Sequence, residues 1–115
     1  GKASLAYGRG KIINAAALYN TLALDGVWLD FRDPDGCREE TLYVKTMGFK
    51  GRFAIHPEQI KPIHDAYRPT TEELEWAKGV LEEAKTAGSG AFKYQGKMVD
   101  APVLAVARLI ISRED

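Results

Sequence analysis

VWLDFRDPDG, at residues 27–36, predicts an α/β fold for this chain. Its first half, residues 27–31, is a short apolar run suited to a strand that is buried on both faces of a parallel sheet. Asp30 lies at the carboxyl end of that strand. Asp33 and Pro34 then supply an N-cap and a proline at the first helical position, so the strand is predicted to lead directly into a helix.

The same order of elements recurs further along the chain. The predicted helix continues to about Met47 and ends at Gly48, a residue type that often terminates helices. A second buried strand is predicted at residues 52–55. Pro57 then begins another short helix, which Pro62 is expected to disturb.

A helix is also predicted ahead of the first strand. Glycines within residues 8–10 weaken its start, so the regular helix is predicted from about Lys11 to Leu24, with a turn at Asp25-Gly26. The same glycines are not a dinucleotide-binding fingerprint, because no strand precedes them and a third glycine is missing. The alternation of helices and strands indicates parallel βα units, which need neighbouring strands at both edges. The apolar residues at helical spacing are Ile12, Ile13, Ala16, Tyr19 and Leu22.

The pattern of alternating helices and strands ends at Arg68. Thr70 and Glu73 form a capping box for a helix that is predicted to end at Gly88. Gly79 inside this helix costs about 1 kcal/mol relative to alanine, unless a close contact uses the space that it leaves.

A hairpin and a final helix are predicted to follow. Residues 91–99 read as two strands around a Gln95-Gly96 turn. Asp100 is then the N-cap of a helix with Pro102 in its first turn. An ionised carboxylate in that position can also serve as a general base, but the pattern alone indicates a helix cap.

Composition excludes several classes of function. The 115 residues carry 16 basic and 16 acidic side chains, and this balance argues against binding to nucleic acid or to anionic membranes. No apolar run is long enough to span a bilayer. Cys37 is the single cysteine, so no internal disulfide can form, and it is predicted to pack in the core. A cytoplasmic location, or an organelle matrix, fits this cysteine usage.

Polar residues lie at the carboxyl ends of both predicted strands, where ligands bind in parallel α/β folds. Asp30 could contact a ligand, or its carboxylate could bond loop amides or a neighbouring arginine such as Arg32, and the residues leave both readings open. His56, followed by Pro57, occupies the same place on the next strand. Taken alone, that histidine is better explained by hydrogen bonds to the backbone. Two polar strand ends in register nevertheless favour a shared site.

Three ordered motifs resemble those of a known enzyme superfamily. They are LDGVWLDFRDPDG at residues 24–36, MGFKGRFAIHPEQI at 47–60 and GKMVDAP at 96–102. In this order the chain resembles the HpcH/HpaI aldolase and citrate lyase β-subunit superfamily. It is most similar to the branch that acts on CoA thioesters, including malyl-CoA and citramalyl-CoA lyases, because the shorter aldolases lack the third motif.

The resemblance implies a (β/α)8 barrel with an appended lid. Residues 1–68 would be the C-terminal part of the barrel, with its last two βα units, and residues 69–115 an α+β lid that contains the hairpin. The rest of the barrel would precede this chain. By resemblance it would carry the glutamate and aspartate that bind Mg²⁺. The chain is therefore expected to be a C-terminal fragment that has no metal ligands of its own and is inactive alone.

The resemblance also implies a reaction and its residues. These enzymes reversibly cleave a C–C bond of a 3-hydroxyacyl-CoA thioester into an acyl-CoA and an oxo acid, with Mg²⁺ as a Lewis acid. Asp100 would be catalytic, reaching into a neighbouring subunit of a trimer or hexamer to move a proton at the thioester carbon. The implied substrate-binding residues are Asp30 and Phe31 near the thioester and Ile55, His56 and Pro57 along the pantetheine arm.

Two other functions stay open. One is the β-subunit of a citrate lyase, whose thioester is carried on a protein. The other is a non-catalytic module that binds thioesters or assists assembly. A strand-end glutamate and aspartate pair in the upstream sequence would favour the enzyme over the module.

Overall fold

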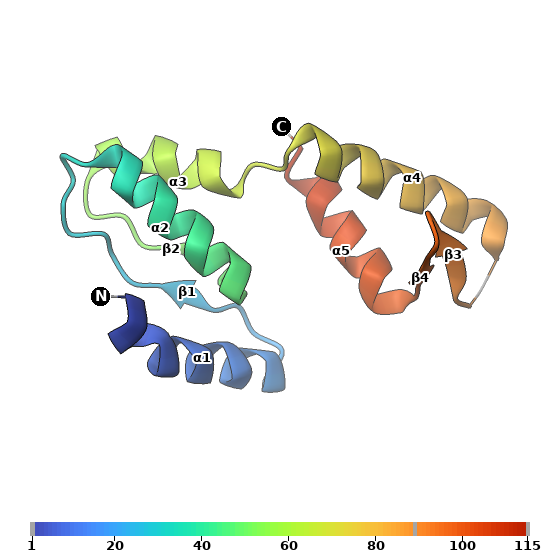
Figure 1. The fold of residues 1–115 in the computed structure, drawn as a ribbon, viewed down its shortest axis with the longest axis horizontal. Coiled ribbons are helices and arrows are strands. Elements are labelled where there is room, and N and C mark those ends of the chain that lie inside the picture. The colour runs from blue at the N-terminus through green and yellow to red at the C-terminus, as the bar shows by residue number, and fades with distance from the viewer. Residues whose placement is uncertain (1, 89, 115) are drawn as a thin grey trace. The chain divides into compact units, whose positions relative to one another are not determined.

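The computed structural model describes residues 2–88 and 90–114. The chain divides after Tyr67 into two units, and each unit has its own hydrophobic core (Figure 1). No helix among the described residues is long and apolar enough to cross a membrane. In chain order the elements are α1 (Lys2–Leu18), β1 (Leu24–Asp25), α2 (Pro34–Met47), β2 (Gly51–Arg52), η1 (Pro57–Gln59), α3 (Ile60–Tyr67), α4 (Thr71–Ala87), β3 (Phe92–Tyr94), β4 (Lys97–Val99) and α5 (Ala101–Ser112).

A short parallel sheet lies at the centre of the first unit. β1 pairs with β2 in parallel, with Leu24 opposite Gly51 and Asp25 opposite Arg52. Helices α1 and α2 contact the same side of this sheet, because Arg9 of α1 pairs with Asp25 and Glu40 of α2 pairs with Arg52, whose side chains are neighbours on one face. Both helices also contribute to one core cluster around Ala23, which precedes β1. That cluster contains Ala23, Val44 and Phe49, with Ile13, Ala16, Tyr43 and Met47 packed against it.

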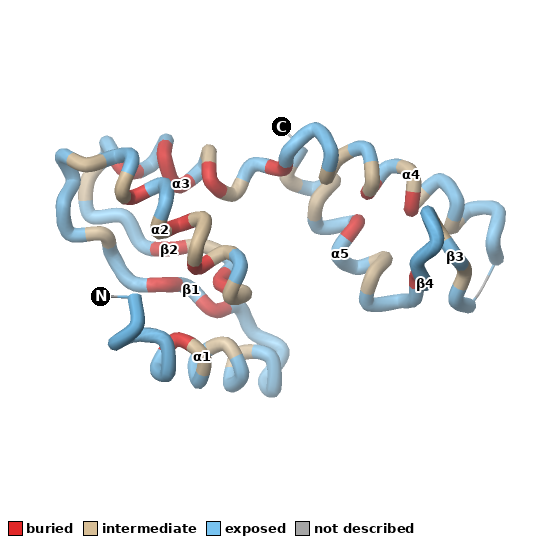
Figure 2. The backbone as a smooth tube through the Cα atoms, viewed as in Figure 1, coloured by how far each residue is buried: buried red, intermediate tan, exposed pale blue. Residues whose placement is uncertain are grey.

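The positions predicted for the two strands are wrong. Pairing occurs at residues 24–25 and 51–52, upstream of most of the predicted runs at 27–31 and 52–55. Asp25, expected in a turn, is instead a buried strand residue. The apolar character of the two runs predicts burial, but Leu29 is 79% exposed and Ile55 is 53% exposed, and exposed residues follow both strands (Figure 2).

Helix α1 begins and ends earlier than predicted. It starts at Lys2 and tolerates both of its glycines, and it ends at Leu18 where Leu24 was expected. Asn20 terminates it in the left-handed region, with φ of 52°. The amides of Thr21 and Asn20 bond to the carbonyls of Ala16 and Ala17, a Schellman arrangement with asparagine in the usual glycine position. Asn20 is therefore the stop signal that the helical spacing alone did not reveal.

The capping predictions for α2 are confirmed. The Asp33 side chain accepts a hydrogen bond from the Gly36 amide at 3.0 Å, and Gly48 closes the helix with φ of 118°. Pro57 begins the short helix η1, as expected. The predicted disturbance at Pro62 is wrong, because this proline lies in the first turn of α3, where a helix does not need its N–H.

The predicted elements of the second unit are confirmed. Thr70 caps α4 by accepting a bond from the Glu73 amide at 3.1 Å. Strands β3 and β4 form an antiparallel hairpin, and Gln95 and Gly96 both have positive φ, as a tight type I′ turn requires. The core of this unit consists of Ala77, Val80, Val99 and Ala107, from α4, β4 and α5.

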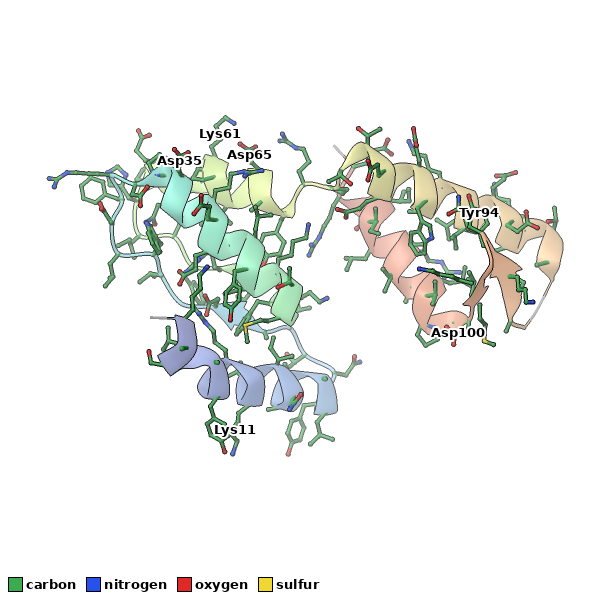
Figure 3. All side chains as sticks on the ribbon, in the orientation of Figure 1. Lys11, Asp35, Lys61, Asp65, Tyr94 and Asp100 are labelled. Carbon is green, nitrogen blue, oxygen red and sulfur yellow. The ribbon has the colours of Figure 1, made fainter. Side chains whose placement is uncertain are left out.

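Gly79 has a packing role in this unit. A Cβ atom at position 79 would overlap the hydroxyl and ring of Tyr94, which lies on β3 (Figure 3). The absence of a side chain therefore lets the hairpin lie against α4. This is the close contact that offsets the low helix propensity of glycine.

Candidate functional site

Phe31 lies in the segment that follows β1, and His56 lies in the segment that follows β2. Their rings are stacked, with centroids 4.4 Å apart and planes inclined by 16°. The Arg32 guanidinium lies over the same Phe31 ring, 5.2 Å from its centroid. The structure thus brings together two of the residues expected at a shared site, and it adds a cation beside them.

His56 is held by backbone hydrogen bonding. Its Nδ1 accepts a bond from the Glu58 amide at 3.1 Å, and the residue is the N-cap of η1, whose first residue is Pro57. Because Nδ1 is the acceptor, the neutral ring carries its hydrogen on Nε2. The ring therefore presents one N–H donor while one of its faces lies against Phe31.

Asp30 makes a local bond of the kind considered as the alternative to ligand contact. Its Oδ1 accepts a hydrogen bond from the Arg32 amide at 3.0 Å. This bond two residues ahead stabilises the turn that follows the strand. Asp30 is exposed, so its carboxylate is accessible from solvent.

Gln59 connects the segment that follows β1 to the segment that follows β2, and the sequence analysis did not predict this role. The residue is 1% exposed. Its Oε1 accepts a bond from the Ile55 amide at 2.8 Å, and its Nε2 donates to the Trp28 carbonyl at 2.6 Å. A signal was present, because Gln59 precedes the buried residues Ile63 and Ala66 at helical spacing and thus shares the buried face of α3.

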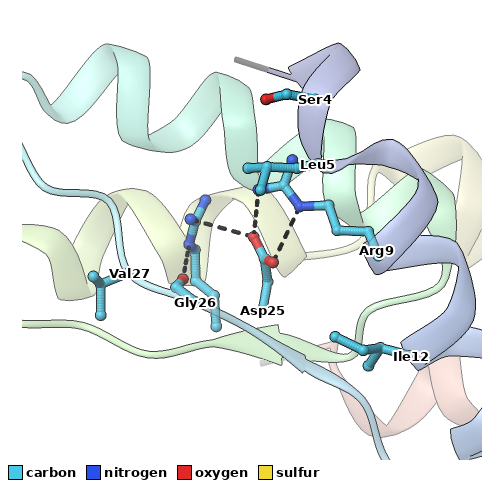
Figure 4. A pocket seen from close by; sticks show the side chains of 9 residues that line it. Ser4, Leu5, Arg9, Ile12, Asp25, Gly26 and Val27 are labelled. Atoms are coloured by element: carbon cyan, nitrogen blue, oxygen red, sulfur yellow. Dashed lines mark hydrogen bonds and ion pairs between the residues drawn. The ribbon is translucent and has the colours of Figure 1, made fainter.

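Four charged side chains from α1, β1, α2 and β2 form a separate polar cluster in the first unit. Arg9 donates from Nε and Nη2 to the Asp25 carboxylate at 3.2 and 3.0 Å (Figure 4). Arg52 lies 3.3 Å from the same carboxylate and 3.0 Å from Glu40, which Arg9 also reaches at 3.4 Å. We call Arg9, Asp25, Glu40 and Arg52 the buried charge cluster. It balances two positive and two negative side chains.

The buried charge cluster is structural in character. Arg9 and Arg52 come from different elements, and both converge on Asp25, so the cluster ties α1 and β2 to β1. Burial lowers the pKa of Arg9, but the hydrogen bonds and charges of Asp25 and Glu40 outweigh that effect and raise it above the ordinary value. A cavity of about 330 Å³ borders the cluster, and one Arg9 nitrogen, Nη1, is buried there without a hydrogen-bond partner among the described residues. The lining residues are Ser4, Leu5, Gly8, Arg9, Ile12, Asp25, Gly26, Val27 and Arg52.

Cys37 packs in the interior, as predicted. It is fully buried on α2, and this burial raises the pKa of its thiol. A thiol with a raised pKa is a poor nucleophile at neutral pH.

Asp100 lies in the second unit, at the start of α5 (Figure 3). Its Oδ1 accepts a hydrogen bond from the Val103 amide at 3.3 Å, so the predicted N-cap is confirmed. The side chain is exposed. A catalytic role for this carboxylate stays a prediction.

The described residues of this chain do not fit a magnesium site. Within residues 2–88 and 90–114, no group of three or more His, Cys, Asp or Glu side chains could hold a metal ion. Asp25 and Glu40 are both engaged by arginines. A divalent cation would therefore need carboxylates from elsewhere.

Known proteins match nearly the whole chain. It is 38% identical over 109 residues to the mitochondrial citramalyl-CoA lyase of Rattus norvegicus, covering 92% of this chain and 32% of that protein. It is 42% identical over 105 residues to a citrate lyase subunit beta-like protein of Mycobacterium tuberculosis, covering 91% and 38%. It is 38% identical over 114 residues to citrate lyase subunit beta of Escherichia coli K12, covering 96% and 38%. The chain thus spans about a third of the length of these relatives.

Solved structures share the fold. The protein CitE of Mycobacterium tuberculosis, in complex with magnesium, acetoacetate and coenzyme A, matches with a TM-score of 0.75 and 42% identity over 91% of this chain and 39% of that one. A citrate lyase of Burkholderia xenovorans LB400 matches in fold, with a TM-score of 0.73 and 23% identity over 95% of this chain and 34% of that one. The family description C-C bond lyase of the TIM-barrel fold matches residues 10–114. The chain therefore belongs to the carbon–carbon bond lyase family of the TIM-barrel fold.

Proposed function

We propose that this chain is the C-terminal part of a Mg²⁺-dependent lyase for 3-hydroxyacyl-CoA thioesters of the malyl or citramalyl type. The enzyme reversibly cleaves one C–C bond and releases an acyl-CoA and an oxo acid. The observation that carries the proposal is 38% identity to citramalyl-CoA lyase over 92% of the chain. The complex of a related structure with magnesium and coenzyme A supports it further.

The two units take different parts in this proposal. Residues 1–68 form the last two βα units of the barrel, and residues 69–115 form its lid. The parallel pairing of β1 with β2 supports the first assignment, together with helices α1 and α2 on one side of that sheet. In this proposal the Mg²⁺ ligands are supplied by the part of the enzyme that lies outside this chain.

The stacked pair of Phe31 and His56 suits the thioester arm. Ile55, which precedes His56 in the chain and is 53% exposed, can contact the aliphatic parts of pantetheine, with the exposed edge of the Phe31 ring nearby. The Nε2–H of His56 can donate to an amide or thioester carbonyl. Asp30 and Pro57, the chain neighbours of Phe31 and His56, complete the site.

Asp100 moves the proton in this proposal. In the condensation direction its carboxylate takes a proton from the carbon next to the thioester carbonyl, and the resulting enolate-like carbanion attacks the carbonyl carbon of the oxo acid. The carbonyl oxygen of the oxo acid then takes a proton from solvent and becomes the 3-hydroxyl group. In cleavage the 3-hydroxyl gives its proton to solvent as its oxygen becomes the carbonyl of the oxo acid and the C–C bond breaks. The protonated Asp100 carboxyl then gives its proton to the acyl-CoA carbon. The lid acts on the site of a neighbouring subunit, so the active form is a homo-oligomer, a trimer or a hexamer.

An assay of the full-length polypeptide tests the proposal. Malyl-CoA and citramalyl-CoA are offered with Mg²⁺, and acyl-CoA release is followed by chromatography. We expect cleavage of at least one of them, loss of activity with a chelator and recovery when Mg²⁺ is restored. Cleavage only of a carrier-protein thioester would favour a citrate lyase β-subunit. Binding of coenzyme A without any cleavage would favour the non-catalytic module.

A further inference from the structure

We propose that Gln59 is a positioning residue for the thioester site. Its side-chain amide holds the segments that follow β1 and β2 at the separation that lets Phe31 stack on His56. The inference rests on the proposed function, because it assumes that the stacked pair contacts the thioester arm.

Both polar atoms of the Gln59 side chain are used, and each contacts a different segment. Oε1 accepts from the Ile55 amide at 2.8 Å, and Nε2 donates to the Trp28 carbonyl at 2.6 Å. The partners are backbone groups, so the amide fixes the main chain of both segments. At 1% exposure the amide is shielded from water, which would otherwise compete for both bonds.

The two Gln59 bonds form a bridge that connects the segments beyond the point where the pairing of β1 with β2 ends. Just past the last pair of the β1–β2 register, the Phe53 amide donates to the Asp25 carbonyl at 3.2 Å. Beyond it, the Gln59 amide connects Trp28 to Ile55 across a position where a direct strand bond would otherwise form. Phe31 lies three residues after one end of the bridge, and His56 one residue after the other. The bridge is therefore close enough to set the spacing of the stacked rings.

Gln59 also belongs to the turn that holds His56. Its backbone amide donates to the His56 carbonyl at 3.0 Å, while the His56 ring accepts from the Glu58 amide. Two residues of the short helix η1 thus act on His56. Glu58 fixes the orientation of the His56 ring, and Gln59 fixes the distance between that ring and Phe31. A change at Gln59 should alter the placement of His56 without removing any group that contacts substrate.

The test compares variants of the full-length polypeptide. Gln59→Met keeps the length of the side chain but forms neither bond, whereas Gln59→Glu keeps the acceptor for Ile55. Val44→Ala is the matched control, because Val44 is as buried as Gln59 but lies in a different place. It packs with Ala23 and Phe49, which precede β1 and β2, and not with the segments that follow these strands. Kinetics with the thioester that the wild type cleaves and calorimetric binding of coenzyme A are the two measurements.

We expect Gln59→Met to raise KM and to weaken coenzyme A binding by roughly tenfold or more, with a smaller change in kcat, since small misplacements carry large costs. Gln59→Glu should recover part of the loss, and Val44→Ala should lower the melting temperature with KM unchanged.

A lower melting temperature in Gln59→Met with KM and binding unchanged would overturn the proposal, as would failure of both Gln59 variants to fold. A wild type that cleaves no thioester contradicts the proposed function instead, and weaker coenzyme A binding in Gln59→Met then still supports the positioning role. A wild type that does not bind coenzyme A overturns that role as well.

Discussion

The Asp100 carboxylate has one observed role and one proposed role. As an N-cap it accepts the bond from the Val103 amide. As a proton carrier it would need a titratable oxygen, which the cap does not require. Asparagine is as good an N-cap as aspartate but cannot carry the proton, so one substitution separates the two roles.

We therefore expect Asp100→Asn in the full-length polypeptide to leave the melting temperature and substrate affinity nearly unchanged. Turnover should fall by about 10² to 10⁴-fold, the usual effect of removing a positioned acid or base. Mixing this variant with one that is disabled at the metal site should restore activity, because hybrid oligomers would contain intact shared sites. Absence of rescue, with subunit exchange verified by mass spectrometry, would mean that Asp100 serves its own barrel or only caps α5.

Single residues with local partners could be predicted from the sequence. Asp33, Thr70 and Asp100 all cap helices, because each bonds to an amide three residues ahead and needs no distant partner. Gln59 and Asp25 could not be predicted in the same way. Their partners lie four to 31 residues away in the chain, so the fold must already exist before the bonds can be seen.

At the level of elements, the buried charge cluster determines where β1 pairs with β2. Asp25 and Arg52 are opposite each other in the register and form an ion pair, and Arg9 brings α1 to the same carboxylate. A slip of one residue would turn Asp25 away from both arginines. The cluster therefore favours this register over its neighbours.

Asp25→Asn should destabilise the full-length protein by about 3–5 kcal/mol, because removing one partner leaves buried charge uncompensated. The exposed pair of Lys61 and Asp65 on α3 supplies the control, and Lys61→Ala should cost about 0.5 kcal/mol or less. Urea denaturation followed by circular dichroism measures both. Equal effects of the two substitutions would show that the cluster does not hold the register.

Helices and strands were not equally predictable. The ends of α2 and α4 follow from their own capping residues, whereas the strands depend on pairing partners that the sequence does not reveal. The apolar run at residues 27–31 predicts buried side chains, but only Trp28 is even half-buried. Val27, Leu29 and Phe31 are exposed. The hairpin of the second unit was predictable because its turn residues lie between its two strands.

On the scale of the whole chain, both units expose large apolar side chains, but only in the first unit do these lie beside the parallel strands. The second unit closes a core of its own from α4, the hairpin and α5. In the first unit, large apolar side chains near both strands are exposed, with Leu24 at 46%, Val27 at 38% and Phe53 at 58%. Two paired strands also leave backbone groups at their outer edges, which favours pairing with further strands.

A polypeptide of residues 1–115 alone is therefore expected to self-associate or to aggregate. Exposed apolar side chains beside unpaired strand edges combine the two features that drive edge-to-edge association. Sedimentation velocity should reveal species larger than a monomer, and thermal melts should be broad or irreversible. Phe53→Lys, which places a charge beside the edge of β2, should reduce the association, whereas Lys93→Ala on the hairpin should leave it unchanged. A monodisperse monomer that unfolds cooperatively would contradict this expectation, and with it the proposal that the first unit is completed by further strands of a barrel.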